Sequence, residues 1–136
     1  MMRRWIRALI LASVVSFFTG LALVSQALAP QPLSLALECV KGDCALLRGA
    51  PQTAGMRSGL VQLKPGESVG WHTTSQHEEA VVILRGQGEA LVKGQPNRPF
   101  KAPGLVYVPP RTSHNMSNTG HELLEYVYVV APVQAN

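Results

Sequence analysis

Residues Gly66–Gly86, GESVGWHTTSQHEEAVVILRG, contain the features that decide the fold of this chain. Two histidines and two adjacent glutamates lie just before a smooth apolar run, Ala80 to Leu84, and a glycine follows it. A short apolar run bounded by turn residues is typical of a buried strand. This stretch therefore predicts a buried strand with titratable side chains at its N-terminal end.

Short strands of the same kind are expected along the rest of the chain. Turn and breaker residues such as Lys64-Pro65-Gly66 and Pro109-Pro110 recur at short intervals, and nothing after residue 30 holds a helical period over three turns. We therefore expect an all-β sandwich or barrel. Its strands are predicted at residues 59–63, 69–73, 80–84, 89–92, 105–108 and 123–130, with a candidate edge strand at 33–37.

The first residues have the layout of a secretory signal peptide. Three arginines within the first seven residues precede an uncharged, mostly apolar stretch at 8–24, and small residues follow. We predict a signal-peptide helix over residues 1–27, cleaved before Leu28, and hence an exported protein, periplasmic or secreted. A retained membrane anchor is the alternative, but the apolar stretch is short for crossing a bilayer. No stable membrane span is expected after cleavage.

The remaining chain is long enough for one domain with one core. We expect a lead-in over residues 28–45 and a barrel domain over residues 46–136. The chain carries 12 Lys and Arg against 8 Asp and Glu, and three of the arginines leave with the signal peptide. The mature charge is then close to neutral, so the basic isoelectric point gives no argument for nucleic-acid binding.

The lead-in holds both cysteines, Cys39 and Cys44, in the sequence CVKGDC. In an exported protein, a close pair of cysteines predicts a disulfide. A metal-binding pair or a redox couple is the alternative, although the spacing is not C-x-x-C. We expect the disulfide to give local rigidity, because cross-linking a short loop removes little chain entropy.

Strand parity places part of the titratable cluster on one face. Val81 and Ile83 are apolar enough to face a core, so Glu79 and His77, which share their parity, point inward as well. If a tight turn joins this strand to the preceding one in a hairpin, His72 lies opposite Glu79. A carboxylate beside a core needs a partner. A divalent transition metal is one solution, and a hydrogen-bonded His–Glu cluster without metal is another.

The segment GLVYVPPRTSHNMSNTG, residues 104–120, adds a third histidine. Its double proline bends the chain out of the strand ladder just before His114, which allows that side chain to be aimed.

The two segments together resemble the two motifs of the cupin family. The first motif runs G, five residues, H-x-H, three or four residues, E, six residues, G, and Gly66, His72, Glu79 and Gly86 fit it. In the second motif, the proline, histidine and asparagine positions are held by Pro109, His114 and Asn118. The resemblance implies a small double-stranded β-helix, the jelly-roll barrel of cupins, and the homodimers that are common among them.

The resemblance also implies a metal site. His72, Glu79 and His114 match the family's ligand positions, but Thr74 stands where the second histidine of the first motif belongs. We expect His77 to replace it, giving the set His72, His77, Glu79 and His114 around a divalent transition metal that could be Fe, Mn, Zn, Ni or Cu. In the alternative, His77 lies outside the ligand set and the other three form a two-histidine, one-carboxylate site, as in non-haem iron enzymes.

Two classes of function follow from this hypothesis, because the fold does not choose one. The first is an exported metalloenzyme, an oxygenase or isomerase acting on a small molecule. The second is a non-catalytic module that binds a small ligand without a catalytic metal. Arg85 and Arg111 could neutralise a carboxylate ligand if they face the barrel mouth, but solvated strand-end charges are the expected role.

Overall fold

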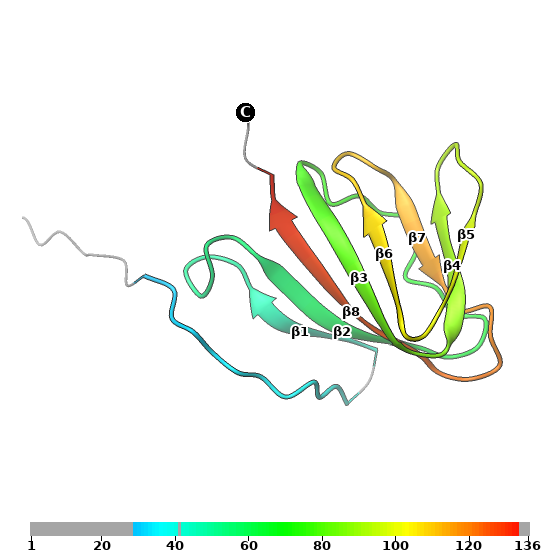
Figure 1. Ribbon diagram of the computed structural model, residues 1–136, viewed down its shortest axis with the longest axis horizontal. Helices are drawn as coiled ribbons and strands as arrows, with labels where there is room; N and C mark the ends of the chain where they lie inside the picture. Colours follow the sequence, from blue (N-terminus) through cyan, green and yellow to red (C-terminus); the bar gives the residue numbers. More distant parts are fainter. Residues whose placement is uncertain (1–28, 41, 134–136) are drawn as a thin grey trace, which may run out of the picture.

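The computed structural model describes residues 29–40 and 42–133, and within these ranges it contains strands and no helix (Figure 1). The predicted signal peptide, residues 1–27, lies outside the described residues. None of the described residues belongs to a helix long and apolar enough to span a membrane. The strands are β1 Asp43–Arg48, β2 Arg57–Leu63, β3 His77–Arg85, β4 Gln87–Val92, β5 Arg98–Lys101, β6 Gly104–Val108, β7 His114–Ser117 and β8 Leu124–Pro132. The all-β fold class is confirmed.

The strands form two antiparallel sheets. The larger has the order β1-β2-β8-β3-β6, and the smaller has the order β5-β4-β7. Figure 1 shows the three strands of the smaller sheet grouped at one side of the molecule. The last strand, β8, lies between β2 and β3, so the centre of the larger sheet is closed only when the whole chain is in place.

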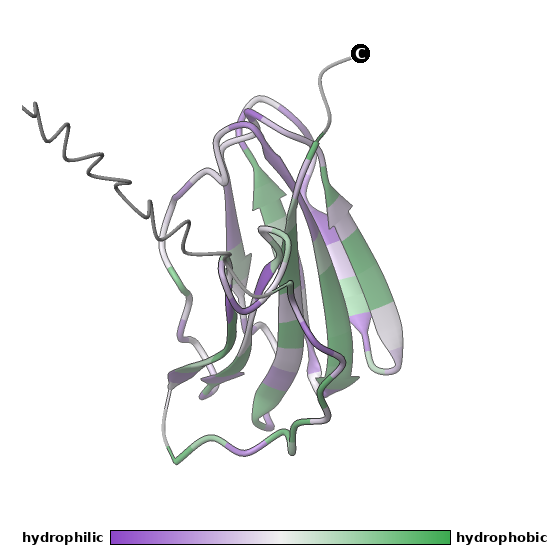
Figure 2. Ribbon diagram, turned by 90° about the vertical axis from the view of Figure 1, so that its left-hand side faces the viewer, coloured by the Kyte–Doolittle hydropathy of each residue, from purple (hydrophilic) through white to green (hydrophobic). Residues whose placement is uncertain are grey.

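The core lies between the sheets and is supplied by alternate strand residues, as the period of a half-buried strand requires. On β3, Val81 and Ile83 are buried while Val82 and Leu84 are exposed. Glu79 shares the inward parity and is only 5% exposed, which confirms the predicted orientation of its side chain. Figure 2 shows polar and apolar residues interleaved along the strands.

The edge of the larger sheet differs from the prediction. Residues 33–37 are exposed and form no strand, so the expected edge strand is wrong. β1 takes the edge instead by pairing with β2. The apolar alternation of 33–37 favours an extended chain, but a strand also needs a neighbour to satisfy its backbone groups. The expected boundary between lead-in and barrel, at residue 45, falls inside β1.

The predicted strand at 69–73 is also wrong, and the condition of a hairpin with β3 is not met. Residues 68–72 run beside β7 through two isolated bridges, which join Ser68 to Ser117 and His72 to His114. β3 pairs with β6 and β8 instead. Gly66 and Gly70, at φ 83° and 89°, bend the segment in ways that few other residues tolerate, and this carries it toward the smaller sheet. β5 and β7 were not among the predicted strands.

The predicted disulfide is confirmed. Cys39 and Cys44 are bonded, with their Cα atoms 5.5 Å apart, and Cys44 is the second residue of β1. Both cysteines of the chain are therefore used, and neither is left for a metal or for redox exchange. Disulfides of this kind are typical of proteins that work in an oxidising compartment.

Candidate metal centre and its pocket

His72 is positioned by the backbone of the segment that runs beside β7. Its amide donates to the carbonyl of His114 at 3.0 Å, and the amide of His114 donates back to the carbonyl of His72 at 2.9 Å. Just before it, the amide of Gly70 donates to Oδ1 of Asn115 at 2.9 Å. The two histidines therefore come from distant parts of the chain but are held side by side, with ring centroids 4.3 Å apart.

Glu79 and His114 are buried together between the two sheets. Their side chains are 6% and 0% exposed, and Oε2 of Glu79 lies 3.1 Å from Nε2 of His114. Neither atom has another partner among the described residues. This carboxylate oxygen and this imidazole nitrogen therefore have only each other as partners. Burying polar atoms with so few partners is costly unless a further group, such as a metal ion, binds them.

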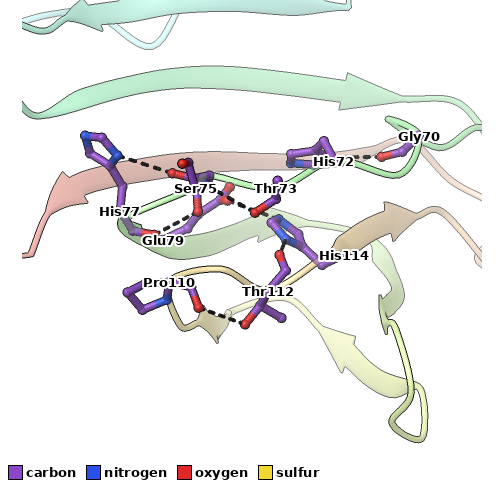
Figure 3. A network of polar contacts seen from close by, with 10 residues as sticks. Gly70, His72, Thr73, Ser75, His77, Glu79, Pro110, Thr112 and His114 are labelled. Atoms are coloured by element: carbon purple, nitrogen blue, oxygen red, sulfur yellow. Dashed lines mark hydrogen bonds and ion pairs between the residues drawn. The ribbon is translucent and has the colours of Figure 1, made fainter.

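Backbone carbonyls orient both histidine rings (Figure 3). Nδ1 of His72 donates to the carbonyl of Gly70 at 2.9 Å, and Nδ1 of His114 donates to the carbonyl of Thr112 at 3.0 Å. With the proton fixed on Nδ1, the lone pair of each neutral ring lies on Nε2, the arrangement usual for metal-ligating histidines. Burial by itself lowers the pKa of His114, but its contacts with Glu79 and the Thr112 carbonyl outweigh this and raise the pKa overall.

Three of the four predicted ligands meet at one point. One ligand atom each from His72, Glu79 and His114 lies within 4.8 Å of the other two. Two imidazole nitrogens and one carboxylate oxygen suit first-row transition metals. The geometry and the two unsatisfied buried atoms fit a divalent ion, and because His72 is exposed, one side of the group is open to the pocket.

His77 lies outside this group. Nδ1 of its ring contacts the carbonyl of Thr74 at 3.2 Å, and in Figure 3 the ring lies to one side, away from His72 and His114. It has the strand parity of Glu79, but it is the first residue of β3, opposite Pro132 at the end of β8. Thr74, at the position of the missing histidine, donates its hydroxyl to the His77 carbonyl at 2.9 Å.

The group opens into a pocket of about 360 Å³ between the sheets. Its walls include polar residues that the sequence analysis did not single out: Asp43, Arg57, Tyr126 and Tyr128. Among these residues, only the two tyrosines could have been found from the sequence, because they alternate with valines along residues 126–129 and therefore share one face of a strand. Arg85 and Arg111 do not line this pocket, and Arg111 donates to Gln76 at 3.0 Å instead.

The model of the cupin domain family matches residues 59–130, more than half of the chain. The chain belongs to the cupin family. The matched segment runs from β2 to β8. It therefore includes the three clustered residues of this cupin and the central strands of both sheets.

Several known proteins are similar to this chain. An oxalate-binding protein from Thermotoga maritima is 34% identical over 70 residues, which are 52% of this chain and 57% of that protein. The cupin thus spans little more than half the length of that relative. A Cupin 2 conserved barrel domain protein from Salinispora arenicola is 26% identical, with a TM-score of 0.57 over 74% of this chain and 85% of that one. A predicted oxalate decarboxylase from Thermotoga maritima shares the fold at 22% identity and a TM-score of 0.53, over 69% and 95% of the two chains.

Proposed function

We propose that this protein is an exported cupin that holds a divalent transition metal on His72, Glu79 and His114 and binds a small molecule in the adjoining pocket. The observation that carries the proposal is the buried pair of atoms, Oε2 of Glu79 and Nε2 of His114, that have only each other as partners. The exposed ring of His72 completes the group on its open side.

Two further observations support the rest of the proposal. The disulfide of the lead-in fits export into an oxidising compartment, together with the signal-like N-terminus. The name of the oxalate-binding relative supports a small, oxygen-rich ligand. A bound divalent ion with open positions would polarise an oxygen of such a ligand. The apolar part of the pocket wall, formed by Val61, Val69, Met116 and Val130, would shield such a ligand from bulk water.

The experiment is calorimetric titration of zinc and manganese ions into purified, metal-free protein. We expect one equivalent to bind in the wild type, and Glu79→Gln and His72→Ala each to lower the affinity by roughly tenfold or more. Glu79→Gln keeps the shape of the buried side chain, and His72 is exposed, so both variants should fold. His77→Ala and His121→Ala are the matched histidine controls and should bind like the wild type. Binding far below one equivalent in the wild type would contradict the proposal.

The second candidate function is an oxygenase or isomerase. Two histidines and one carboxylate form the ligand type of non-haem iron(II) oxygenases, which is the observation in its favour. Oxygen consumption by iron-loaded protein, measured with and without candidate ligands, separates this activity from simple binding. Ligand binding with no turnover under any metal would leave the binding module.

A further inference from the structure

The pocket has a second polar wall, away from the three clustered residues, on the inner face of β1, β2 and β8. Strand register places it there, because residues directly opposite each other in a ladder share a face. Asp43 is opposite Val61, which is opposite Tyr126, and Tyr128 is opposite Gly59. All of these residues except Gly59 line the pocket, whose mouth also includes Arg57.

Tyr126 is the informative member of this wall. It is only 2% exposed and lines the pocket, yet its hydroxyl makes no hydrogen bond to any described residue. Burial above all, and then the negative charges of Glu79 and Asp43, raise its pKa strongly, so the hydroxyl stays protonated. A buried tyrosine usually finds a partner for its hydroxyl. Here the available partner is whatever occupies the pocket.

Gly59 has no side chain, and this leaves the space that the ring of Tyr128 occupies on the same wall. A Cβ at Gly59 would lie 2.6 Å from a ring carbon of Tyr128 and 2.7 Å from its hydroxyl oxygen. The phenol end therefore packs directly against the backbone of β2. Burial, and then Asp43 and Glu79, raise the pKa of Tyr128 as well, although Arg57 opposes the change. Two protonated tyrosines, two residues apart on β8, thus line the pocket.

The charges around the pocket limit the ligand further. Arg57 makes no ion pair with any described residue and offsets the carboxylate of Asp43. In the proposed metal centre, the divalent ion and the Glu79 carboxylate together have a net charge of plus one when both histidines are neutral. A ligand with a single negative charge would then neutralise the pocket, whereas a dianion would leave an excess. Asp43 can in addition accept a hydrogen bond from a ligand hydroxyl.

We propose that Tyr126, Tyr128 and Arg57 form the specificity wall of this cupin and select a small monocarboxylate that also carries hydroxyl groups. The carboxylate or hydroxyl oxygens of the ligand accept from the two tyrosines, Arg57 attracts the negative charge at the mouth, and Asp43 accepts from a ligand hydroxyl. The inference rests on the proposed function in one respect, the charge contributed by the bound ion.

The test uses three probes with one six-carbon skeleton and different charge: sorbitol, gluconate and glucarate. Each is titrated calorimetrically into zinc-loaded and metal-free protein, with the zinc content measured afterwards, because hydroxy acids can extract metal. We expect zinc-loaded wild type to bind gluconate more tightly than either glucarate or sorbitol. Oxalate serves as a short dianion and should bind more weakly than gluconate.

The variants separate the wall from the metal. Tyr126→Phe should weaken gluconate binding by roughly tenfold or more, as expected for losing a hydrogen bond to a charged acceptor, and leave zinc affinity and thermal stability unchanged. Arg57→Gln should weaken the binding of gluconate more than that of sorbitol. Tyr128→Phe should also weaken gluconate binding, and Gly59→Ala should do the same, because its Cβ would displace the Tyr128 ring. Lys101→Gln, at an exposed position of β5, is the charge control and should have no effect.

Three results would overturn the inference: gluconate affinity unchanged in Tyr126→Phe, sorbitol or glucarate bound as tightly as gluconate, or no gluconate binding to either form of the wild type. Stoichiometric zinc binding together with any of these would leave the metal centre standing and remove only the wall. The opposite pattern would reject the metal centre and keep the wall. In that case the protein would bind no zinc, the metal-free protein would bind gluconate, and Tyr126→Phe would weaken that gluconate binding.

Discussion

His72 and His114 are joined by two backbone hydrogen bonds, one in each direction, of 3.0 and 2.9 Å. This bridge fixes the spacing of the two rings independently of any ion. Because the carbonyl of Gly70 also orients the ring of His72, the backbone around residue 70 positions one of the three candidate ligands.

Gly70→Ala should therefore weaken metal binding without touching a ligand. The residue has φ 89°, where an alanine is strained by roughly 1 kcal/mol or more. Relief of that strain would shift the Gly70 carbonyl and release the His72 ring, and we expect zinc affinity to fall by roughly tenfold. Calorimetric zinc titration measures the change. Gly94→Ala is the matched control, at φ 77° and with equally open surroundings; it should lose similar stability but keep its zinc affinity. Equal zinc affinity in both variants would contradict the role of Gly70.

The stability of the metal-free protein should depend on pH through His114. Its pKa is raised in the folded state, so the folded protein holds the proton more tightly than the unfolded chain does. That stabilisation is present below the ordinary histidine pKa of 6.5 and is lost as pH rises through the raised, folded-state value. Urea unfolding should show a larger advantage of wild type over Glu79→Gln at about pH 6 than at about pH 8.5.

The same comparison with Glu122→Gln, an exposed carboxylate, controls for general charge effects and should show no such trend. An advantage over Glu79→Gln that grows toward alkaline pH would refute the assignment.

Asn118 should act on stability and not on binding, although it occupies a motif position. It is 1% exposed; its amide donates to the carbonyls of Leu63 and Glu122 at 2.9 and 2.8 Å, and its Oδ1 accepts from Gly120 at 2.8 Å. Asn118→Asp replaces two donated bonds with contacts between oxygens, and we expect a loss of roughly 2–4 kcal/mol in unfolding free energy.

Chemical denaturation measures this loss for Asn118→Asp. Asn97→Asp, whose exposed amide donates only to Glu89, is the control and should change stability by less than about 1 kcal/mol. A similar loss in both variants would show that the buried position is not special.

The disulfide should be complete but modest in its effect. Thiol labelling of denatured, unreduced protein should find no free cysteine, since Cys39 and Cys44 are bonded. The double change of both residues to serine should cost about 2 kcal/mol, because a short closed loop removes little entropy from the unfolded chain. Two labelled thiols, or unfolding of the whole barrel in the serine variant, would be inconsistent with this assignment.

Part of the site could be predicted from the sequence, because motif spacing and strand alternation are local properties. Glu79 and His114 were identified from motif spacing, and the inward parity of Glu79 from the apolar neighbours that share its face. His77 shares that parity but lies at the strand end, where its ring contacts Thr74 and not the buried pair. Parity specifies a face of the sheet, but it does not specify the depth along the barrel or the direction in which a terminal ring turns.

The sequence by itself determined which residues alternate into a core, where glycines and prolines bend the chain, and which side chains could bind a cation. These properties depend on local stereochemistry, so a short window contains them. Only the tertiary structure decided that His72 pairs with His114 and not with Glu79, that β1 forms the edge, and that the tyrosines of β8 face the pocket. Every residue except proline carries the same backbone donor and acceptor, so the choice of partner strand comes from the packing of the whole chain.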